Sequence, residues 1–331
     1  QEINERREIY NFFGKNKFFF PVSKEEFEAA EHYLGNTDNK QLVVSIANNI
    51  RRKALSLIAN DEEFTLLRNG ISTAVLVLRK LVDFLRLLSK ASASTVFQKS
   101  VERALSILNK KSLQWIFSNE NPDSLSFIKF ALYDHRLRYT VAESISELMK
   151  IIHEIDVFIT VSEIGNSRGF VYAHAVDSDF SIEIQGVYHP CIKGAVANDI
   201  SLDSNSNVLF LTGANMAGKS TLMKSFGVSL YLAHMGFPIA AKSMRFSVQE
   251  GIYTSINVPD DLNMGYSHFY AEVVRVKKIA LEVSSGKRLI VMFDELFKGT
   301  NVKDAYDATV AVTEAFSKIH RCSFIVSTHI M

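Results

Sequence analysis

The stretch TGANMAGKST, residues 212–221, decides how the rest of this chain is interpreted. Gly213 and Gly218 bracket four residues, and Lys219 and Ser220 follow directly, which completes the G-x-x-x-x-G-K-[ST] pattern of a P-loop. The apolar run VLFLT precedes the loop and a helical pattern follows it, which is the context that a P-loop requires. We therefore predict a nucleotide-binding α/β domain around this stretch.

A P-loop holds phosphate groups mainly with backbone donors. Glycines have no Cβ to collide with phosphate oxygens, and the loop ends at a helix N-terminus, whose N–H groups carry a partial positive charge. We expect Lys219 to reach the β- and γ-phosphates of ATP and the Ser220 hydroxyl to bind Mg²⁺. The predicted phosphate-binding residues are Gly213, Ala214, Asn215, Met216, Ala217, Gly218, Lys219, Ser220 and Thr221.

Two carboxylates follow the apolar run RLIVMF further along the chain. Asp294 suits the Walker B role of holding Mg²⁺, and Glu295 suits a general base for the water that attacks the γ-phosphorus. The next apolar run, CSFIVST, ends at His329, which we expect to contact the γ-phosphate. A lone histidine is more often structural, and only its place after the other two motifs favours this role. The predicted catalytic residues are Lys219, Glu295 and His329, and the predicted metal ligands are Ser220 and Asp294.

The order of these motifs is typical of ABC-type ATPases. Sites of this type are completed by a second subunit that contributes a helix start bearing a serine. Ser267 begins a predicted helix in the stretch NMGYSHFYAEV, so its hydroxyl and the first N–H groups offer an anion site. The simpler alternative is that Ser267 only caps its own helix. The motif order predicts a homodimer with composite ATP sites.

Residues 1–160 are predicted to be helical. Ser23 and Glu26 form a capping box, and Gly35 ends that helix. Apolar residues recur at helical spacing along three further segments, and Asn121-Pro122 is predicted to separate two helices. The three seams are Leu42, Ile46, Ile50, Ala54 and Ile58; Ala74, Leu78, Leu81, Leu85 and Leu88; and Val141, Ile145, Leu148, Ile152, Ile155 and Ile159.

The pattern changes near Val161. The segments GFVYAHAV and FSIEIQGVYHP are predicted to be antiparallel strands, and later strands alternate with helices as in a mostly parallel sheet. The predicted fold is an α/β P-loop NTPase of the ABC type, with a mostly parallel sheet and an antiparallel β segment, preceded by an all-α core and lever domain. The predicted domains are 1–160 and 161–331, and both chain ends look internal to a longer protein.

Composition adds few constraints. The net charge is +1 and neither half is strongly basic, so composition alone does not indicate nucleic-acid binding. Cys191 and Cys322 lack metal-ligand spacing, so we expect free thiols in a reducing cytoplasm. The apolar stretch 71–88 is interrupted by charged residues, and no run has the length of a membrane span.

The motifs together resemble those of the MutS family of mismatch-repair ATPases. The family's typical TGPNMGGKST is TGANMAGKST here, GxSTFMxEM is GYSHFYAEV, and DEIGRGTSTYDG is DELFKGTNVKDA. Its ATH strand end appears as STH, and its His-Pro as His189-Pro190. The match covers roughly 160–331, and the opening INERREIYNFF is similar to the start of the family's helical core.

The resemblance implies a role for each matching residue. Asn215 and Ser267 would act across a dimer, and Thr300, Asn301 and Asp304 would lie in a loop that signals between the two sites. The family's adenine-stacking aromatic aligns with Ala195, which predicts weak base selectivity. The Phe-x-Glu motif with which the first domain of the family reads mismatches has no counterpart in this chain.

The sequence is compatible with three functions. The first is an ATPase that changes the grip of helical levers on double-stranded DNA in mismatch repair, through regions partly outside this chain. The second is a MutS-like ATPase that acts on recombination intermediates or ribosomes. The third is a slow nucleotide switch with little turnover, against which the intact Lys219, Asp294 and Glu295 argue.

Overall fold

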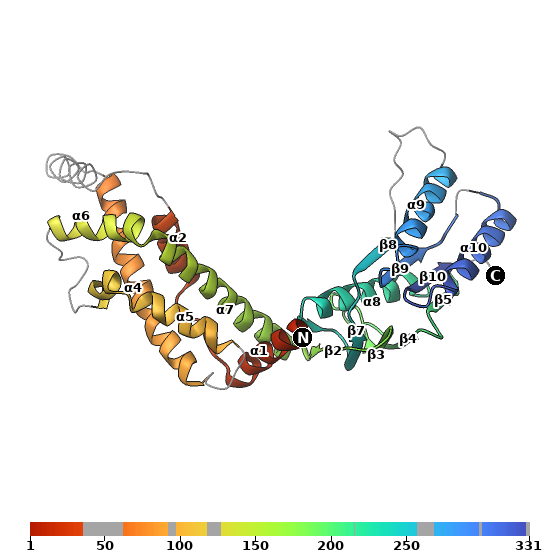
Figure 1. Cartoon of the computed structure of the whole chain (residues 1–331), viewed down its shortest axis with the longest axis horizontal. Helices are drawn as coiled ribbons and strands as arrows, with labels where there is room; N and C mark the ends of the chain where they lie inside the picture. The colour runs from red at the N-terminus through yellow and green to blue at the C-terminus, as the bar shows by residue number, and fades with distance from the viewer. Residues whose placement is uncertain are drawn as a thin grey trace. The chain divides into compact units, whose positions relative to one another are not determined.

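The structure is a computed structural model that describes residues 1–35, 62–91, 97–117, 127–214, 216–256, 268–297 and 300–328. It forms two compact units (Figure 1). One unit is Phe12–Thr160, and the other combines Gln1–Asn11 with Val161–Met331. The sequence predicted a helical domain over residues 1–160, and in the structure residues 1–11 group with residues 161–331.

Side-chain contacts explain why the chain start belongs to the second unit. The Asn4 side chain donates to the Ala175 carbonyl at 2.8 Å and accepts from the Ala175 N–H at 3.1 Å. The Tyr10 ring stacks on Tyr172, with 5.7 Å between ring centroids. A helical pattern does not reveal such long-range contacts, because periodicity reports only which face of a helix is buried.

The described part of the N-terminal half is helical. Helices α1 and α7 each contribute to both units. The elements are α1 (Glu2–Asn16), α2 (Lys24–Gly35), α4 (Glu62–Ala91), α5 (Gln98–Leu108), the 3₁₀ helix η1 (Lys111–Phe117), α6 (Phe127–His135), the π-helix η3 (Arg136–Thr140) and α7 (Ala142–Arg168).

The predicted helical seams agree with burial wherever the structure describes them. The α4 seam from Ala74 to Leu88 is fully buried, and the α7 seam from Val141 to Ile159 is buried throughout. The capping box is present, since Glu26 N–H donates to Ser23 Oγ at 3.2 Å and Ser23 N–H donates to Glu26 Oε2 at 3.1 Å. The seam from Leu42 to Ile58 and the break at Asn121-Pro122 lie outside the described residues.

In the described residues, the second unit combines three sheets with helices α8, α9 and α10, besides the start of α1 and the end of α7. The pattern change expected near Val161 comes later, because α7 continues to Arg168. The strands are β1 (Val171–Tyr172), β2 (His174–Val176), β3 (Ser181–Val187), β4 (Asn198–Asp203), β5 (Val208–Thr212), β6 (Pro238–Ile239), β7 (Ser243–Ser247), β8 (Gly251–Ser255), β9 (Leu289–Asp294) and β10 (Ser323–Thr328), and the helices are α8 (Lys219–His234), α9 (His268–Val283) and α10 (Val302–Ser317).

Strand pairing gives one parallel sheet and one mixed sheet. The parallel sheet has the order β5-β10-β9-β8, which agrees with the predicted parallel layer. The mixed sheet has the order β2-β7-β3-β4, where β3 pairs antiparallel with both neighbours. The prediction of antiparallel pairing fails for β2, which pairs parallel with β7. The short β1 and β6 form a separate antiparallel pair.

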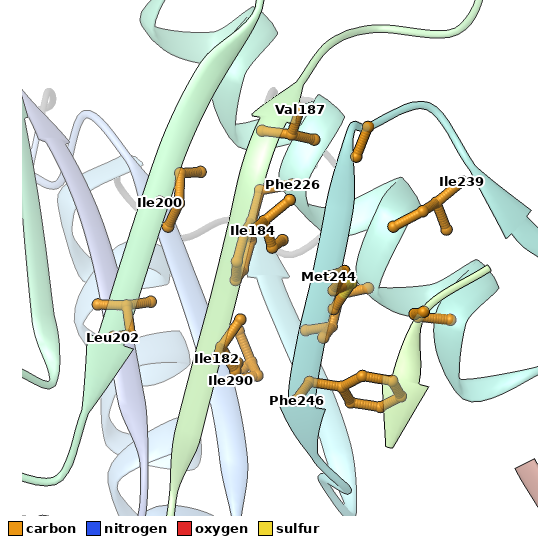
Figure 2. Close-up of a cluster of buried hydrophobic side chains, with 14 of the residues drawn as sticks. Ile182, Ile184, Val187, Ile200, Leu202, Phe226, Ile239, Met244, Phe246 and Ile290 are labelled. Carbon is orange, nitrogen blue, oxygen red and sulfur yellow. The ribbon is translucent and has the colours of Figure 1, made fainter. Parts of the chain in front are cut away.

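Helix α8 lies in a core that both larger sheets share. Figure 2 shows Phe226 of α8 among side chains of the mixed sheet, such as Ile184 and Phe246, with Ile290 of the parallel sheet nearby. A second core lies on the other face of the parallel sheet, where Val276 of α9 and Phe316 of α10 cluster with Phe293. The parallel sheet is therefore covered on both faces.

Burial along the strands reflects these two environments. Every residue of β10 is buried, and so is β9 up to Asp294, because both faces of these strands are covered. Strands β3, β4 and β7 alternate between buried and exposed residues, since only one face of the mixed sheet meets the core. Asp294 is therefore the first residue of β9 that is not fully buried, and Ser327 and Thr328 are buried polar residues at the end of β10.

Candidate functional site at the carboxyl edge of the parallel sheet

The candidate site begins with the order of three parallel strands. Strand β10 lies between β5 and β9, and Ser327 is in register with Leu211 on one side and Asp294 on the other. Neighbouring strands are about 4.8 Å apart, so the backbones of β5 and β9 are separated by about 10 Å. The segments that follow β5 and β9 therefore emerge at one edge of the sheet, where α/β proteins bind ligands.

The loop 213–218 leaves β5 in a conformation that needs positive φ angles. These angles are 144° at Gly213, 67° at Met216 and 93° at Gly218. No atom lies within 4 Å of a Cβ built on Gly218, so its backbone angle, and not lack of space, accounts for the glycine. The Met216 side chain is fully exposed. Asn215 lies outside the described residues.

Lys219 folds back over this loop. Its Nζ donates to the Gly213 carbonyl at 2.7 Å and to the Ala214 carbonyl at 3.1 Å. Helix α8 begins at this residue, and its N-cap, Gly218, supplies no side-chain hydrogen bond. The loop, the ammonium group and the helix start together form a positively polarised cradle of the kind that binds anions.

The two predicted acids lie where β9 emerges from the core, and both are half-buried. Asp294 Oδ1 accepts a hydrogen bond of 2.5 Å from Ser327 Oγ. Glu295 has a φ of 55°, and its N–H donates to the Ser327 carbonyl at 3.0 Å. A residue other than glycine rarely adopts this left-handed conformation, and such strain is often found at functional sites.

The residues at this edge also include oxygen donors of the kind that bind Mg²⁺ in proteins. Mg²⁺ prefers oxygen ligands and uses few protein side chains. The Ser220 hydroxyl, in the first turn of α8, and the Asp294 carboxylate are of this type. Ser327 holds one oxygen of Asp294, and the other carboxylate oxygen has no protein hydrogen bond among the described residues. The donor chemistry fits Mg²⁺.

The structure places most, but not all, of the predicted site residues. Lys219 and Ser220 follow β5, and Asp294 and Glu295 lie at the end of β9, on the same edge. Ser267 and His329 lie outside the described residues, as does Asn215. Ala195 is in the connection between β3 and β4, where its N–H donates to the Ile192 carbonyl at 3.3 Å.

The structure adds two contacts that the sequence analysis did not predict, one made by Asn301 and one by Ser327. Asn301 caps α10, because its side chain accepts from the Asp304 N–H at 3.0 Å. Ser327, which contacts both acids, was not among the predicted site residues. The sequence signal for Ser327 was a polar residue directly after the apolar residues of the strand. Its partners could not be predicted, because they depend on the order of the strands in the sheet.

Other observations concern the chain as a whole. Cys191 is an exposed free thiol and Cys322 a buried one, as expected. Among the described residues, no helix combines the length and the apolar character needed to cross a membrane.

Comparison with known proteins gives a consistent result. Residues 209–331 match the family model of MutS domain V. The chain is 32% identical over 193 residues to the DNA mismatch repair protein MutS of Fusobacterium nucleatum, which covers 56% of this chain and 21% of that protein. It is 28% identical over 293 residues to MutS of Leuconostoc mesenteroides, covering 84% of this chain and 34% of the relative. For MutS of Brevibacillus brevis the identity is 32% over 203 residues, covering 58% and 23%.

These alignments cover at most about a third of the length of those relatives. The matched segment 209–331 contains the loop after β5, the acids after β9 and the whole of β10. Residues 209–331 are thus similar to MutS domain V, and the chain is similar to these MutS proteins over longer stretches.

Proposed function

We propose that this chain binds and hydrolyses ATP with Mg²⁺, as the ATPase part of a MutS-like protein. The observation that carries this proposal is the shared carboxyl edge of β5, β10 and β9, where Lys219 and the open start of α8 follow β5 and where Asp294 and Glu295 lie at the end of β9. In this proposal, residues 161–331 are a P-loop NTPase domain of the ABC type and residues 1–160 a helical core and lever domain.

Each side chain has a distinct role in this proposal. The amides of residues 213–218 and the Lys219 ammonium bind the phosphates, and the Lys219 bonds to loop carbonyls are exchanged for bonds to phosphate oxygens. Ser220 and Asp294 would hold Mg²⁺, which supplies charge neutralisation at the phosphates when it is bound. Glu295 accepts a proton from the attacking water, and Thr221 completes the helix start.

The site is proposed to be shared between two copies of the chain. A single phosphate cradle on a sheet edge leaves the γ-phosphate open to water, which weakens every electrostatic contact there. A partner's Ser267 and Asn215 would close the site in a homodimer, and His329 would contact the γ-phosphate. ATP then favours the closed dimer and ADP does not, because only ATP offers contacts to both subunits.

The proposed target of the ATP-driven conformational change is double-stranded DNA, and the proposed location is the cytoplasm. The relatives that support this are named as DNA mismatch repair proteins. Two alternatives keep the same ATP site: action on recombination intermediates or ribosomes, and a slow nucleotide switch. Binding assays with mismatched duplex, branched DNA and ribosomes distinguish mismatch repair from action on recombination intermediates or ribosomes. Steady-state ATP turnover distinguishes an ATPase from a slow nucleotide switch.

The proposed function is tested with Glu295→Gln. The amide keeps the size of the side chain but cannot take a proton, so we expect Mg²⁺-ATP binding to persist while single-turnover hydrolysis slows by roughly 100-fold or more. Sedimentation of this variant with ATP, with ADP and without nucleotide measures the dimer. Unchanged single-turnover hydrolysis would remove Glu295 as the base, and equal mass in all three states would exclude the shared site.

A further inference from the structure

One residue of the carboxyl edge contacts both acids. Ser327 lies near the end of β10 with a fully buried side chain. Its Oγ donates to Asp294 Oδ1 at 2.5 Å, and its carbonyl accepts the Glu295 N–H at 3.0 Å. The side chain and the main chain of Ser327 therefore fix two consecutive residues, the last residue of β9 and the residue that follows it.

The two bonds have different consequences. The hydroxyl bond engages one oxygen of Asp294, which restricts rotation of the carboxylate and leaves the other oxygen to a ligand. Such bonds to a charged acceptor are shorter and stronger than bonds between neutral groups. The carbonyl bond supports Glu295 in its left-handed backbone conformation, which redirects the chain as it leaves β9.

The position of β10 extends this effect to the phosphate cradle. Ser327 is in register with Leu211, and Thr328 with Thr212, the last residue before the loop at Gly213. The backbone of β10 thus fixes where the loop after β5 begins, while the Ser327 hydroxyl sets the orientation of the Asp294 carboxylate. A substitution that removes only the hydroxyl should therefore affect the carboxylate and leave the loop in place.

We propose that Ser327 is a positioning residue, whose hydroxyl orients Asp294 for Mg²⁺ while the strand backbone holds Glu295 and the phosphate cradle. This inference rests on the proposed function, because it concerns how the metal ligand of that site is held. It predicts that loss of the hydroxyl weakens the effect of Mg²⁺ on nucleotide binding more than it weakens nucleotide binding itself.

The test compares three substitutions on one strand. Ser327→Ala removes the hydroxyl, and Ser327→Thr keeps a donor at the same position. Ser323→Ala is the matched control, because Ser323 is also fully buried on β10 but its Oγ has no hydrogen-bond partner among the described residues. Binding of a fluorescent ATP analogue is measured with and without Mg²⁺, alongside the Mg²⁺ concentration that gives half-maximal turnover.

We expect Ser327→Ala to raise the half-saturating Mg²⁺ concentration by roughly tenfold or more, the range expected for a lost hydrogen bond to a charged group. Affinity for the nucleotide without Mg²⁺ should change much less. Ser327→Thr should restore Mg²⁺ dependence to within about threefold of the parent, and Ser323→Ala should match the parent. If Ser327→Ala does not fold, Ser327→Cys, whose thiol is a weak donor, should give an intermediate value.

The outcomes separate this inference from the proposed function. If the parent protein neither binds nor hydrolyses ATP, the proposed function fails. If the parent is an Mg²⁺-dependent ATPase and Ser327→Ala and Ser323→Ala have the same Mg²⁺ dependence, only the positioning role of Ser327 is overturned. A Ser327→Thr protein that remains as impaired as Ser327→Ala also overturns it, because the donor would then be irrelevant.

Discussion

Helices α8 and α10 have the same length of sixteen residues but begin in opposite ways. The N-cap of α10 is Asn301, whose side chain accepts from the Asp304 N–H and also donates to the Asp304 carboxylate at 2.6 Å. The N-cap of α8 is Gly218, in a left-handed conformation and with no side-chain hydrogen bond. One helix start is closed by its own sequence, and the other is left available to a ligand.

This difference shows how a ligand site can be distinguished from an ordinary helix start. A capped helix satisfies some of its first N–H groups internally, whereas an uncapped one depends on solvent or a bound anion. At α8 the missing cap coincides with a basic side chain, Lys219, folded over the preceding loop. The four predictions below change each helix start or the other end of α8, beginning with the largest effect.

The largest effect is expected from Lys219→Ala. The substitution removes the only side-chain cation that the described loop contacts, so phosphate charge is no longer balanced at the open start of α8. We expect turnover to fall by roughly 100-fold or more, as for the loss of one preorganised charge at a transition state. Arg245→Gln, on the exposed face of the mixed sheet, is the charge-matched control and should leave turnover unchanged. Parental turnover in Lys219→Ala would remove the phosphate site.

The second prediction compares two glycines. Gly218 and Gly286 have φ angles of 93° and 82°, and an added Cβ meets no atom within 4 Å at either position. Alanine at either site should therefore destabilise folding by roughly 1–2 kcal/mol, because L-residues are strained in this region. Only Gly218→Ala should also weaken ATP binding, since of the two glycines only Gly218 lies in the proposed phosphate-binding loop. Equal ATP affinity in the two variants would show that the conformation of Gly218 has no part in binding.

The sequence was sufficient to predict the helices and strands that a local pattern marks. Strands β5, β9 and β10 lie close to the predicted apolar runs VLFLT, RLIVMF and CSFIVST, and helix α8 follows the P-loop as predicted. Strand β4 was missed, since NDISLD has only two apolar residues and only these, Ile200 and Leu202, are buried. The parallel pairing of β2 and the contacts of Ser327 depend on strand order, which local patterns do not encode.

The third prediction concerns the other end of α8. His234, in the last turn, is bonded on both ring nitrogens, with Leu230 O at 2.8 Å from Nδ1 and Gln249 N–H donating to Nε2 at 2.9 Å. The Nε2 atom is an acceptor, so the ring is neutral. Burial lowers the pKa of His234, and the Leu230 carbonyl only partly offsets this effect.

The sign of the pH effect follows from that lowered pKa. As pH falls below about 6.5, the unfolded chain gains a proton at His234 before the folded protein does, so stability decreases. The loss is at most about 1.4 kcal/mol per pH unit between the unfolded and folded pKa values. Chemical denaturation of the parent and His234→Gln from pH 7.5 to 5 measures the difference. If the free energy of unfolding depends on pH in the same way in the two proteins, His234 does not contribute to the loss of stability at low pH.

The smallest effect is expected at the closed helix start. Asn301→Ala removes the cap of α10, which should cost about 1 kcal/mol of stability, whereas Asn301→Ser keeps a capping oxygen and should cost little. The resemblance to MutS proteins instead assigns Asn301 to a loop that signals between two ATP sites. Chemical denaturation and ATP turnover of both variants separate the two roles, because a cap responds to the loss of the oxygen and a signalling contact responds to the loss of the amide.

If Asn301→Ser has parental stability but altered turnover, Asn301 acts beyond α10. If turnover in Asn301→Ser is also parental, the closed start of α10 is structural, and the contrast with the open start of α8 is complete.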